Sequence, residues 1–135
     1  MATKTFEIQP FQPPASVDQV EIRRIVDDYY GAWFDADPDR MACVLHPELA
    51  KRGWVTNADG ERIVAADTAE TMVEWTRRGI GRTDDPVARA IDVRVIEVYD
   101  DIATALVHTP RYIETLQLIR TPDGWQILNA LWRTP

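Results

Sequence analysis

Apolar positions follow a helical period in the first half of the chain and a strand period in the second. Between Val17 and Ala36 apolar side chains recur every three or four residues, which predicts a helix with one broad buried face. Shorter patterns of the same kind predict helices over Pro38 to Leu45 and Thr68 to Arg78. The buried face of the first helix is expected to hold Ile22, Ile25, Val26, Tyr29, Tyr30 and Trp33.

Residues with capping side chains stand at the start of each helical pattern. Ser16 with Gln19, and Asp67 with Glu70, have the spacing of a capping box, in which two side chains satisfy free backbone N–H groups at the helix start. Asp37 precedes a proline and is expected to cap the second helix. The three helices therefore have defined N-terminal boundaries.

Alternating apolar and polar residues predict strands in the second half. A first pair, Leu49 to Thr56 and Arg62 to Ala65, is joined by a turn that ends at Gly60. Four further strands, about 88–99, 102–109, 111–121 and 125–133, are separated by turns and form an antiparallel meander. Helices followed by strands favour the α+β class.

Three helices ahead of a strongly curved antiparallel sheet predict a cone, in which the helices close one face of the sheet and leave a pocket. Residues 1–15, rich in proline, are expected to be an extended arm, and residues 16–135 a single domain. We expect a homodimer, because Trp125 and Ile127 alternate to one face of the last strand and Leu128 and Trp132 to the other.

Composition excludes several classes of protein. The net charge of -7 and the pI near 4.7 disfavour nucleic-acid binding. No apolar run approaches the roughly 20 residues of a membrane span, and the single Cys43, expected to be buried, forms no internal disulfide. These features predict a cytoplasmic protein without a membrane partner. Since Ser16 is the only serine and no glycine-rich nucleotide loop or clustered metal-ligand motif occurs, we expect neither cofactor nor metal.

Three runs carry a resemblance to a known family: YYGAWFDADPDRM, LHPELAKR and IETLQLIRTPDGWQILNALW. Together they resemble the nuclear transport factor 2-like superfamily and, within it, the putative lumazine-binding family related to SnoaL-like proteins, over roughly Val20 to Trp132. The resemblance implies a cone-shaped, cystatin-like fold, a small-molecule cavity, and often a homodimer formed through the sheet. Two departures are Glu114-Thr115-Leu116, where the family often has Asp-Tyr-Leu, and Ala130, where a lysine is common.

Four residues are candidates for acid/base chemistry. Tyr29 occupies the place where steroid-isomerase-like relatives have a hydrogen-bonding tyrosine, although it could equally be a core aromatic. Glu114 suits proton transfer if it points into the cavity, and is a surface charge if it points outward. His46 and His108 have side chains that titrate near neutral pH, but His46 in a His-Pro pair can also simply end a helix.

Candidate ligand contacts are mostly aromatic. Lys51 and Arg52 could hold a carboxylate or phosphate, or could be a solvated pair; strand alternation lets only one of them face inward. Where an isomerase would have its carboxylate, this chain has Lys51-Arg52-Gly53-Trp54. The full set is Tyr30, Trp33, Lys51, Arg52, Trp54, Trp75, Tyr112, Asn129 and Trp132.

Two classes of function stay open. The first is a small-molecule-binding protein with an aromatic-lined cavity. The second is a cofactor-independent lyase, isomerase or cyclase that acts on a small, partly aromatic or polyketide-like substrate by acid/base catalysis. A protein-interaction module is a weaker alternative. A carboxylate or histidine deep in an open cavity would favour the enzyme.

Overall fold

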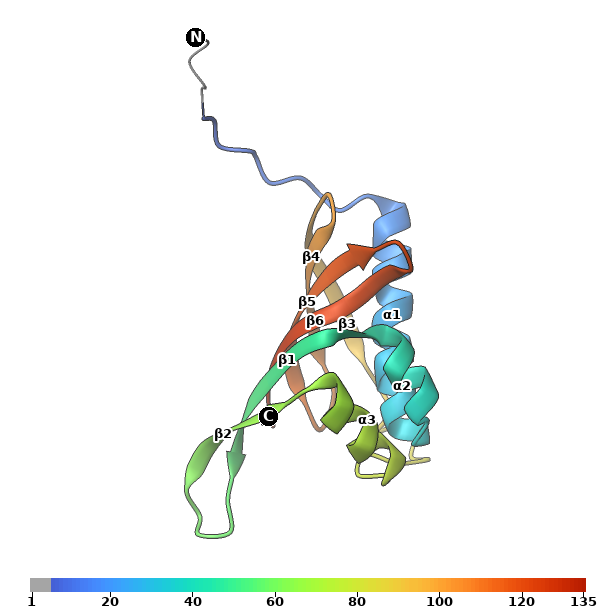
Figure 1. Ribbon diagram of the computed structural model, residues 1–135, viewed down its shortest axis with the longest axis vertical. Helices are drawn as coiled ribbons and strands as arrows, with labels where there is room; N and C mark the ends of the chain where they lie inside the picture. The colour runs from blue at the N-terminus through green and yellow to red at the C-terminus, as the bar shows by residue number, and fades with distance from the viewer. Residues whose placement is uncertain (1–5) are drawn as a thin grey trace.

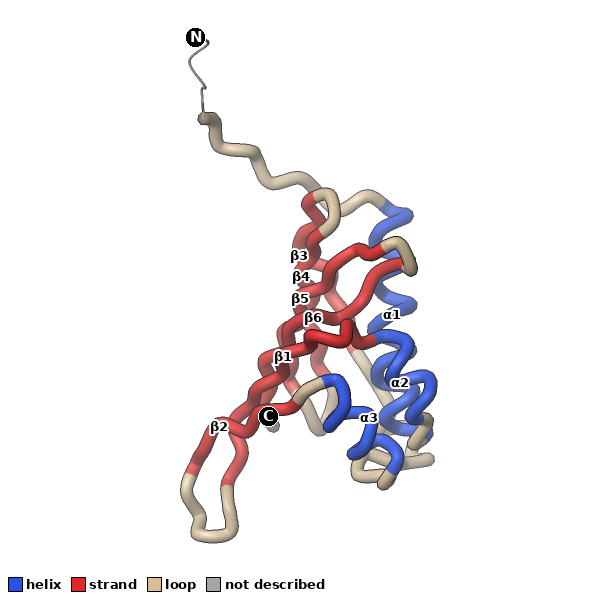
Figure 2. Tube along the Cα trace, in the orientation of Figure 1, coloured by secondary structure: helices blue, strands red, loops and turns tan. Residues whose placement is uncertain are grey.

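A computed structural model describes residues 6–135 of the chain (Figure 1). The elements are α1 (Ser16–Asp35), α2 (Pro38–Val44), β1 (Leu45–Thr56), β2 (Arg62–Asp67), α3 (Ala69–Arg77), β3 (Asp92–Tyr99), β4 (Ile102–His108), β5 (Ile113–Thr121) and β6 (Gly124–Arg133). Residues 6–15 contain neither helix nor strand and extend away from the body of the domain (Figure 2); residues 1–5 of the expected arm lie outside the described part of the chain.

The six strands form one sheet in the order β2-β1-β6-β5-β4-β3. All three helices lie on the same side of this sheet, and the β1–β2 hairpin extends beyond them (Figure 1). The last four strands form the expected meander, whereas β1 lies parallel to β6. The α+β cone expected from the sequence is thus confirmed, with one parallel pair in its sheet.

The core fills the space between α1 and the inner face of the sheet. Helix α1 contributes its expected apolar face, of which Ile22 and Val26 are fully buried. The strands contribute alternate residues, and Leu116 and Ile127 are also fully buried. Burial of these side chains from both layers is the main favourable term that holds helix to sheet.

The helix caps differ from two of the three expectations. Ala15, not Ser16, is the N-cap of α1, and the Gln19 side chain donates to the carbonyl of Pro14 at 3.1 Å. The expected box of Ser16 and Gln19 is therefore wrong: Ser16 already lies in the first turn, where its side chain cannot cap the helix. Asp37 caps α2 as predicted, accepting from the Arg40 N–H at 3.1 Å.

The N-cap of helix α3 lies one residue after the predicted cap, Asp67. Thr68 is the N-cap, and it forms a reciprocal capping box with Thr71 at 3.2 and 2.8 Å. The predicted box of Asp67 and Glu70 is wrong, because Asp67 is the last residue of β2 and its carboxylate turns toward α3. There it accepts hydrogen bonds from the Thr71 hydroxyl and the Trp75 indole.

An extra residue in β6 changes which side chains face the helices. Leu118 pairs with Ile127, but Gln117 pairs with Asn129, so Leu128 is a β-bulge. Beyond the bulge the alternation is reversed, and Trp132 lies on the same inner face as Ile127. The expectation that Trp132 shares the outer face of β6 with Leu128, on which part of the dimer argument rested, is wrong, whereas Leu128 does lie on the face opposite Trp125 and Ile127.

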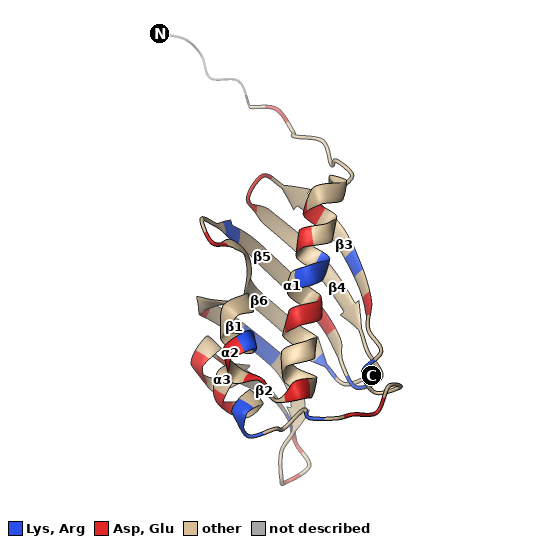
Figure 3. Ribbon diagram, turned by 90° about the vertical axis from the view of Figure 1, so that its right-hand side faces the viewer, with Lys and Arg blue, Asp and Glu red and all other residues tan. Residues whose placement is uncertain are grey.

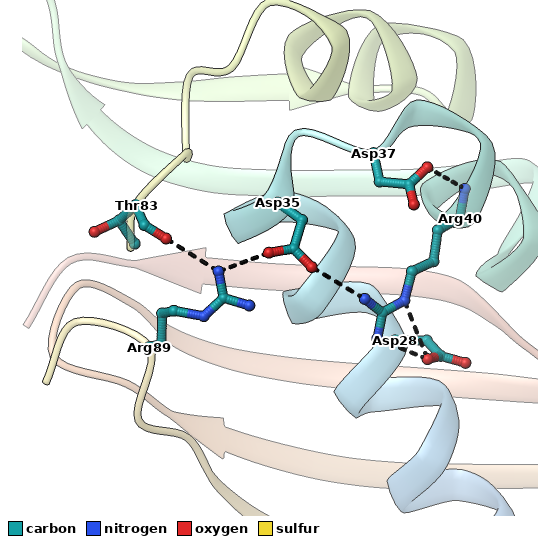
Figure 4. A network of polar contacts seen from close by, with 6 residues as sticks. All are labelled: Asp28, Asp35, Asp37, Arg40, Thr83 and Arg89. Carbon is teal, nitrogen blue, oxygen red and sulfur yellow. Dashed lines mark hydrogen bonds and ion pairs between the residues drawn. The ribbon is translucent and has the colours of Figure 1, made fainter. Parts of the chain in front are cut away.

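Arg89 ties the segment after α3 to the end of α1, and Arg40 ties α2 to α1 (Figure 4). The Arg89 guanidinium donates to Asp35 at 2.8 Å and to the Thr83 carbonyl at 3.0 Å. Arg40 of α2 donates to Asp28 at 2.9 Å and to Asp35 at 3.4 Å. A hydrogen bond from Arg89, reinforced by both guanidinium charges, lowers the pKa of Asp35. The network holds the loop between α3 and β3 beside α1.

The exposure of Cys43 and the absence of a membrane-spanning helix among the described residues are two further features of the fold. Cys43 is exposed, so the expectation that it is a buried core thiol is wrong; it lies on the outward side of the short helix α2. Among the described residues, no helix is both long enough and apolar enough to span a bilayer.

The outward face of the sheet carries apolar side chains that the helices leave uncovered. Tyr99, Ile102 and Leu131 are exposed there, and Leu128 is half-buried beside them. Contiguous exposed apolar surface of this kind usually marks a protein interface. We therefore propose that two copies of the chain associate through this face. The residues of this interface differ from those expected from simple alternation along β6, because Trp132 lies on the inner face.

Replacement of Ile102 by glutamate should convert this dimer to a monomer, because each copy would bring an unpaired carboxylate into the two-fold interface. Light scattering at micromolar concentration measures the outcome. Val87→Glu is the control, since Val87 is 73% exposed in the loop before β3. A monomeric unmodified protein, or an Ile102→Glu variant that stays dimeric, contradicts the proposal.

Candidate functional site

A cavity of about 430 Å³ lies between α1, α3 and the sheet. Helix α1 contributes three aromatic side chains, β1 contributes Lys51, β2 ends at its edge with Asp67, and β5 contributes Glu114. Its aromatic lining residues are Tyr29, Tyr30, Trp33, Trp75, Tyr112 and Trp132. The remaining lining residues, Val55, Ala65, Ala66, Met72 and Ile80, are apolar. The cavity thus has apolar walls and a small number of polar groups.

Glu114 is the centre of the polar floor of this cavity, and its side chain is 2% exposed. Its Oε1 accepts from the Tyr30 hydroxyl at 2.6 Å, and its Oε2 accepts from the Tyr29 hydroxyl at 3.1 Å. The ammonium of Lys51 lies 3.1 Å from Oε2 and donates to the Tyr29 oxygen at 2.5 Å. Four side chains from three elements therefore form one closed network.

Strand register brings Lys51 and Glu114 to the same inner face. Glu114 lies opposite Trp132 in β6, and Lys51 lies beside Ala130, two residues earlier in the same strand. The small side chain of Ala130 leaves room for Lys51 to reach across β6.

The network fixes the protonation state of its donors. Burial, followed by the Glu114 carboxylate, raises the pKa of Tyr29 and of Tyr30. Burial alone would lower the pKa of Lys51, but the Glu114 carboxylate and Tyr29 outweigh it and raise that pKa. At neutral pH both tyrosines therefore keep their hydroxyl protons and Lys51 stays an ammonium.

Two glycines seat the indole rings of the cavity wall. A Cβ at Gly53 would overlap the ring of Trp132, and a Cβ at Gly81 would overlap the ring of Trp33. The loop that Arg89 ties to α1 brings Gly81 into this position. Trp33 then donates its indole N–H to the Tyr112 hydroxyl at 3.1 Å. Close backbone approach thus fixes two of the rings.

Strand alternation separates Lys51 from the two residues near it that were also expected in the site. Lys51 points into the cavity, whereas Arg52 is exposed and Trp54 packs on the outward face under the Arg62 guanidinium, 4.6 Å from the ring centroid. The expected roles of Arg52 and Trp54 in this cavity are wrong for that reason. Asn129 also faces outward, where its amide donates to Gln117, because the bulge at Leu128 turns it away from the face that holds Ile127.

Neither histidine lines the cavity. His46 is half-buried in β1, and its Nδ1 accepts from the Glu48 N–H at 3.0 Å. His108 is exposed at the end of β4, because its neighbour Val107 takes the inward position. The acid/base roles expected of His46 and His108 in this cavity are therefore wrong, while Tyr29 and Glu114 do contact each other.

Sequence reasoning missed Asp67 as a wall residue, since it treated this residue as a helix cap. One of its oxygens accepts from the Thr71 hydroxyl at 2.8 Å and from the Trp75 indole at 2.9 Å. The spacing of these three residues, four and eight apart, was a usable signal for a contact along α3. Within residues 6–135, no group of three histidine, cysteine or carboxylate side chains is placed to hold a metal ion.

Solved structures similar to this chain share its fold. They include an NTF-2 like protein of unknown function from Silicibacter pomeroyi, 14% identical, with a TM-score of 0.68 over 89% of this chain and 98% of that one. An NTF2-like protein of unknown function from Methylobacillus flagellatus, 14% identical, gives 0.64 over 93% and 99%. A cystatin-like fold protein from Burkholderia xenovorans, 20% identical, gives 0.57 over 87% and 91%.

At these low identities, the structural similarity establishes the nuclear transport factor 2-like fold and nothing about activity. A second comparison, with models of protein families, matches residues 17–133 to the model described as putative lumazine-binding. No curated protein matches the chain.

Removal of Lys51 should destabilise the fold strongly. Lys51→Met leaves the Glu114 carboxylate buried without its cation, which typically costs about 3 to 5 kcal/mol of unfolding free energy. Urea denaturation measures the change. The double variant Lys51→Met with Glu114→Gln should recover a large part of the loss, because the uncompensated charge is then gone.

The matched control is Arg77→Met, which breaks the exposed pair of Arg77 with Glu74 on α3. This change should leave the free energy of unfolding almost unaltered, since solvent screens exposed pairs. Equal effects of Lys51→Met and Arg77→Met would show that the buried network does not hold the fold together.

Proposed function

The chain belongs to the putative lumazine-binding family, and on this premise we propose that it is a small-molecule-binding protein that holds a flat, partly aromatic ligand in the cavity. The observation that carries the proposal is the cavity itself: an aromatic-lined space of about 430 Å³ above a preassembled polar floor. Ligand sites typically measure about 300 to 1,000 Å³ and combine apolar walls with a few fixed polar groups. The volume suits a ligand with two or three rings.

The polar floor favours binding over acid/base catalysis. The hydroxyl protons of Tyr29 and Tyr30 are both donated to Glu114, and Lys51 is an ammonium rather than a free amine. A catalytic base needs a lone pair directed at the substrate proton, but donors already occupy three of the roughly four acceptor sites of the Glu114 carboxylate. The floor thus supports the sheet under the ligand more readily than it exchanges protons with it.

Binding in this cavity is tested with 2-naphthylmethanol as a neutral aromatic probe. The indole N–H signals of the protein in ¹⁵N-correlated NMR spectra report the position of the probe. We expect the signals of Trp33 and Trp75 to shift on titration, because both rings line the cavity, and the signal of Trp54 to stay in place, because it lies on the other face. Trp33→Ala should weaken binding about fivefold, since loss of one aromatic contact is worth roughly 1 kcal/mol.

Trp54→Ala is the matched control, because Trp54 lies outside the cavity. It should leave the dissociation constant within about twofold of the original, a change of well below 1 kcal/mol in binding free energy. Saturable binding that moves Trp54 alone, or an unchanged affinity in Trp33→Ala, would place the ligand elsewhere.

One observation keeps the lyase, isomerase or cyclase as a second candidate: a carboxylate, Glu114, lies on the wall beside two tyrosine hydroxyls. Native mass spectrometry of protein purified from its own cells should identify a bound ligand. We expect that ligand to be recovered unchanged after incubation with the protein. Chemical conversion by the unmodified protein, lost in Glu114→Gln while the ligand still binds, would establish the enzyme instead.

A further inference from the structure

We infer that the cavity selects a cationic aromatic ligand, whose protonated amine lies against Asp67 while its rings pack among Trp33, Trp75 and Tyr112. This inference deepens the proposed function and rests on it, since it names the charge of the ligand that the same cavity would take. Three features carry it: the charges on the wall, the hydrogen bonds that those charges already make, and the rings around the remaining carboxylate oxygen.

The charged groups on the cavity wall do not balance. They are one ammonium, Lys51, and two carboxylates, Glu114 and Asp67. Lys51 and Glu114 neutralise each other at 3.1 Å, although Lys51 is the Cα partner of Asp67 in the adjacent strand. Asp67 has no ion-pair partner within salt-bridge distance in the described part of the chain. The wall therefore carries one uncompensated negative charge, which repels a carboxylate or phosphate on a ligand.

The hydrogen bonds of the floor leave little for an anion to bind. Tyr29 and Tyr30 donate to Glu114, and Lys51 donates to both Glu114 and Tyr29. The one arginine that the sequence placed beside this site, Arg52, is exposed on the outward face. An anionic ligand would have to break the buried ion pair to obtain a cation, and that pair is the most buried electrostatic contact of the site.

Asp67 offers an acceptor on the rim. Its Oδ1 is held by the Thr71 hydroxyl at 2.8 Å and by the Trp75 indole at 2.9 Å, which fix the carboxylate in place. Its Oδ2 makes no hydrogen bond to any residue in the range 6–135. A positioned carboxylate oxygen on a cavity wall is a natural partner for a protonated amine, through a charge-assisted hydrogen bond.

The neighbouring rings add to the preference for a cation. Trp33 and Trp75 have committed their indole N–H groups to Tyr112 and Asp67, so the surfaces that remain toward the cavity are ring surfaces. Aromatic faces attract ammonium groups, because the face of the ring carries partial negative charge. Trp75 already contacts a cation outside the cavity, where the Arg78 guanidinium lies 5.3 Å from the centroid of its ring.

The charge of the whole molecule acts in the same direction. Acidic residues recur along α1 (Figure 3), and the chain has a net charge of -7. A negative field of this kind raises the local concentration of cations and speeds their association. It gives no specificity on its own, which comes from Asp67 and the rings.

Three probes with the same naphthalene ring test the inference: 2-(aminomethyl)naphthalene, a cation at neutral pH, 2-naphthylmethanol, which is neutral, and 2-naphthoate, an anion. Dissociation constants are measured by titration of the tryptophan indole signals. We expect the amine to bind about tenfold more tightly than the alcohol, which corresponds to one charge-assisted contact, and the naphthoate to bind more weakly than both.

Asp67→Asn removes the charge but keeps the acceptor oxygen for Thr71 and Trp75. The amine should then lose its advantage over the alcohol, the affinity of the alcohol should stay within about twofold, and the naphthoate should bind more tightly. Asp59→Asn, in the exposed turn between β1 and β2, removes the same charge outside the cavity and should change none of these values. A salt series on the unmodified protein, from about 20 to about 500 mM NaCl, should reduce the advantage of the amine selectively.

Equal affinities of the amine and the alcohol for the unmodified protein overturn the inference and leave the proposed function standing. The inference is also overturned if the amine still binds more tightly than the alcohol to Asp67→Asn. If that variant does not fold, the inference is overturned when the tighter binding of the amine to the unmodified protein does not respond to salt. If none of the three probes shifts the signals of Trp33 and Trp75, the proposed function fails together with the inference.

Discussion

Burial of the Glu114 carboxylate is the constraint on which the rest of the site depends. A side chain that is 2% exposed and carries a charge is tolerated only with a nearby cation and hydrogen-bond donors. Lys51, Tyr29 and Tyr30 supply these, and they come from a strand and a helix that are distant from Glu114 in sequence. The geometry of three elements is therefore fixed by one charge, and the cavity above it has a rigid floor.

The same constraint explains why a residue suited to proton transfer is a poor candidate for it here. A general base works through an available lone pair and partial desolvation, but the neighbours of Glu114 occupy its oxygens and neutralise its charge. Burial, followed by the Glu114 carboxylate, raises the pKa of both tyrosines, and the carboxylate and Tyr29 raise the pKa of Lys51 against the effect of burial. Stabilising the buried charge and freeing it for chemistry are opposed demands, and this arrangement meets the first.

Local patterns in the sequence are sufficient to predict the elements and part of the site. The apolar period of α1 and the alternation in β5 indicate that Tyr29 and Glu114 can face each other across the cavity. The partner of Glu114 could not be predicted in the same way, because Lys51 reaches it only through the parallel register of β1 and β6, a long-range pairing with no local signal. The bulge at Leu128 likewise reverses an alternation that looks regular in the sequence.

Asp67 shows how a local interpretation can conceal a functional position. Its spacing suggested a helix cap, yet the adjacent Thr68 takes that role with Thr71, which releases the Asp67 carboxylate. The Asp67 carboxylate on the cavity wall differs from the Glu114 carboxylate at the floor in one respect: its Oδ2 accepts no hydrogen bond from any described residue. The two acidic residues of the cavity thus have opposite consequences. The contacts of Glu114 stabilise the fold, whereas Asp67 keeps a carboxylate oxygen that can bind a cationic group of a ligand.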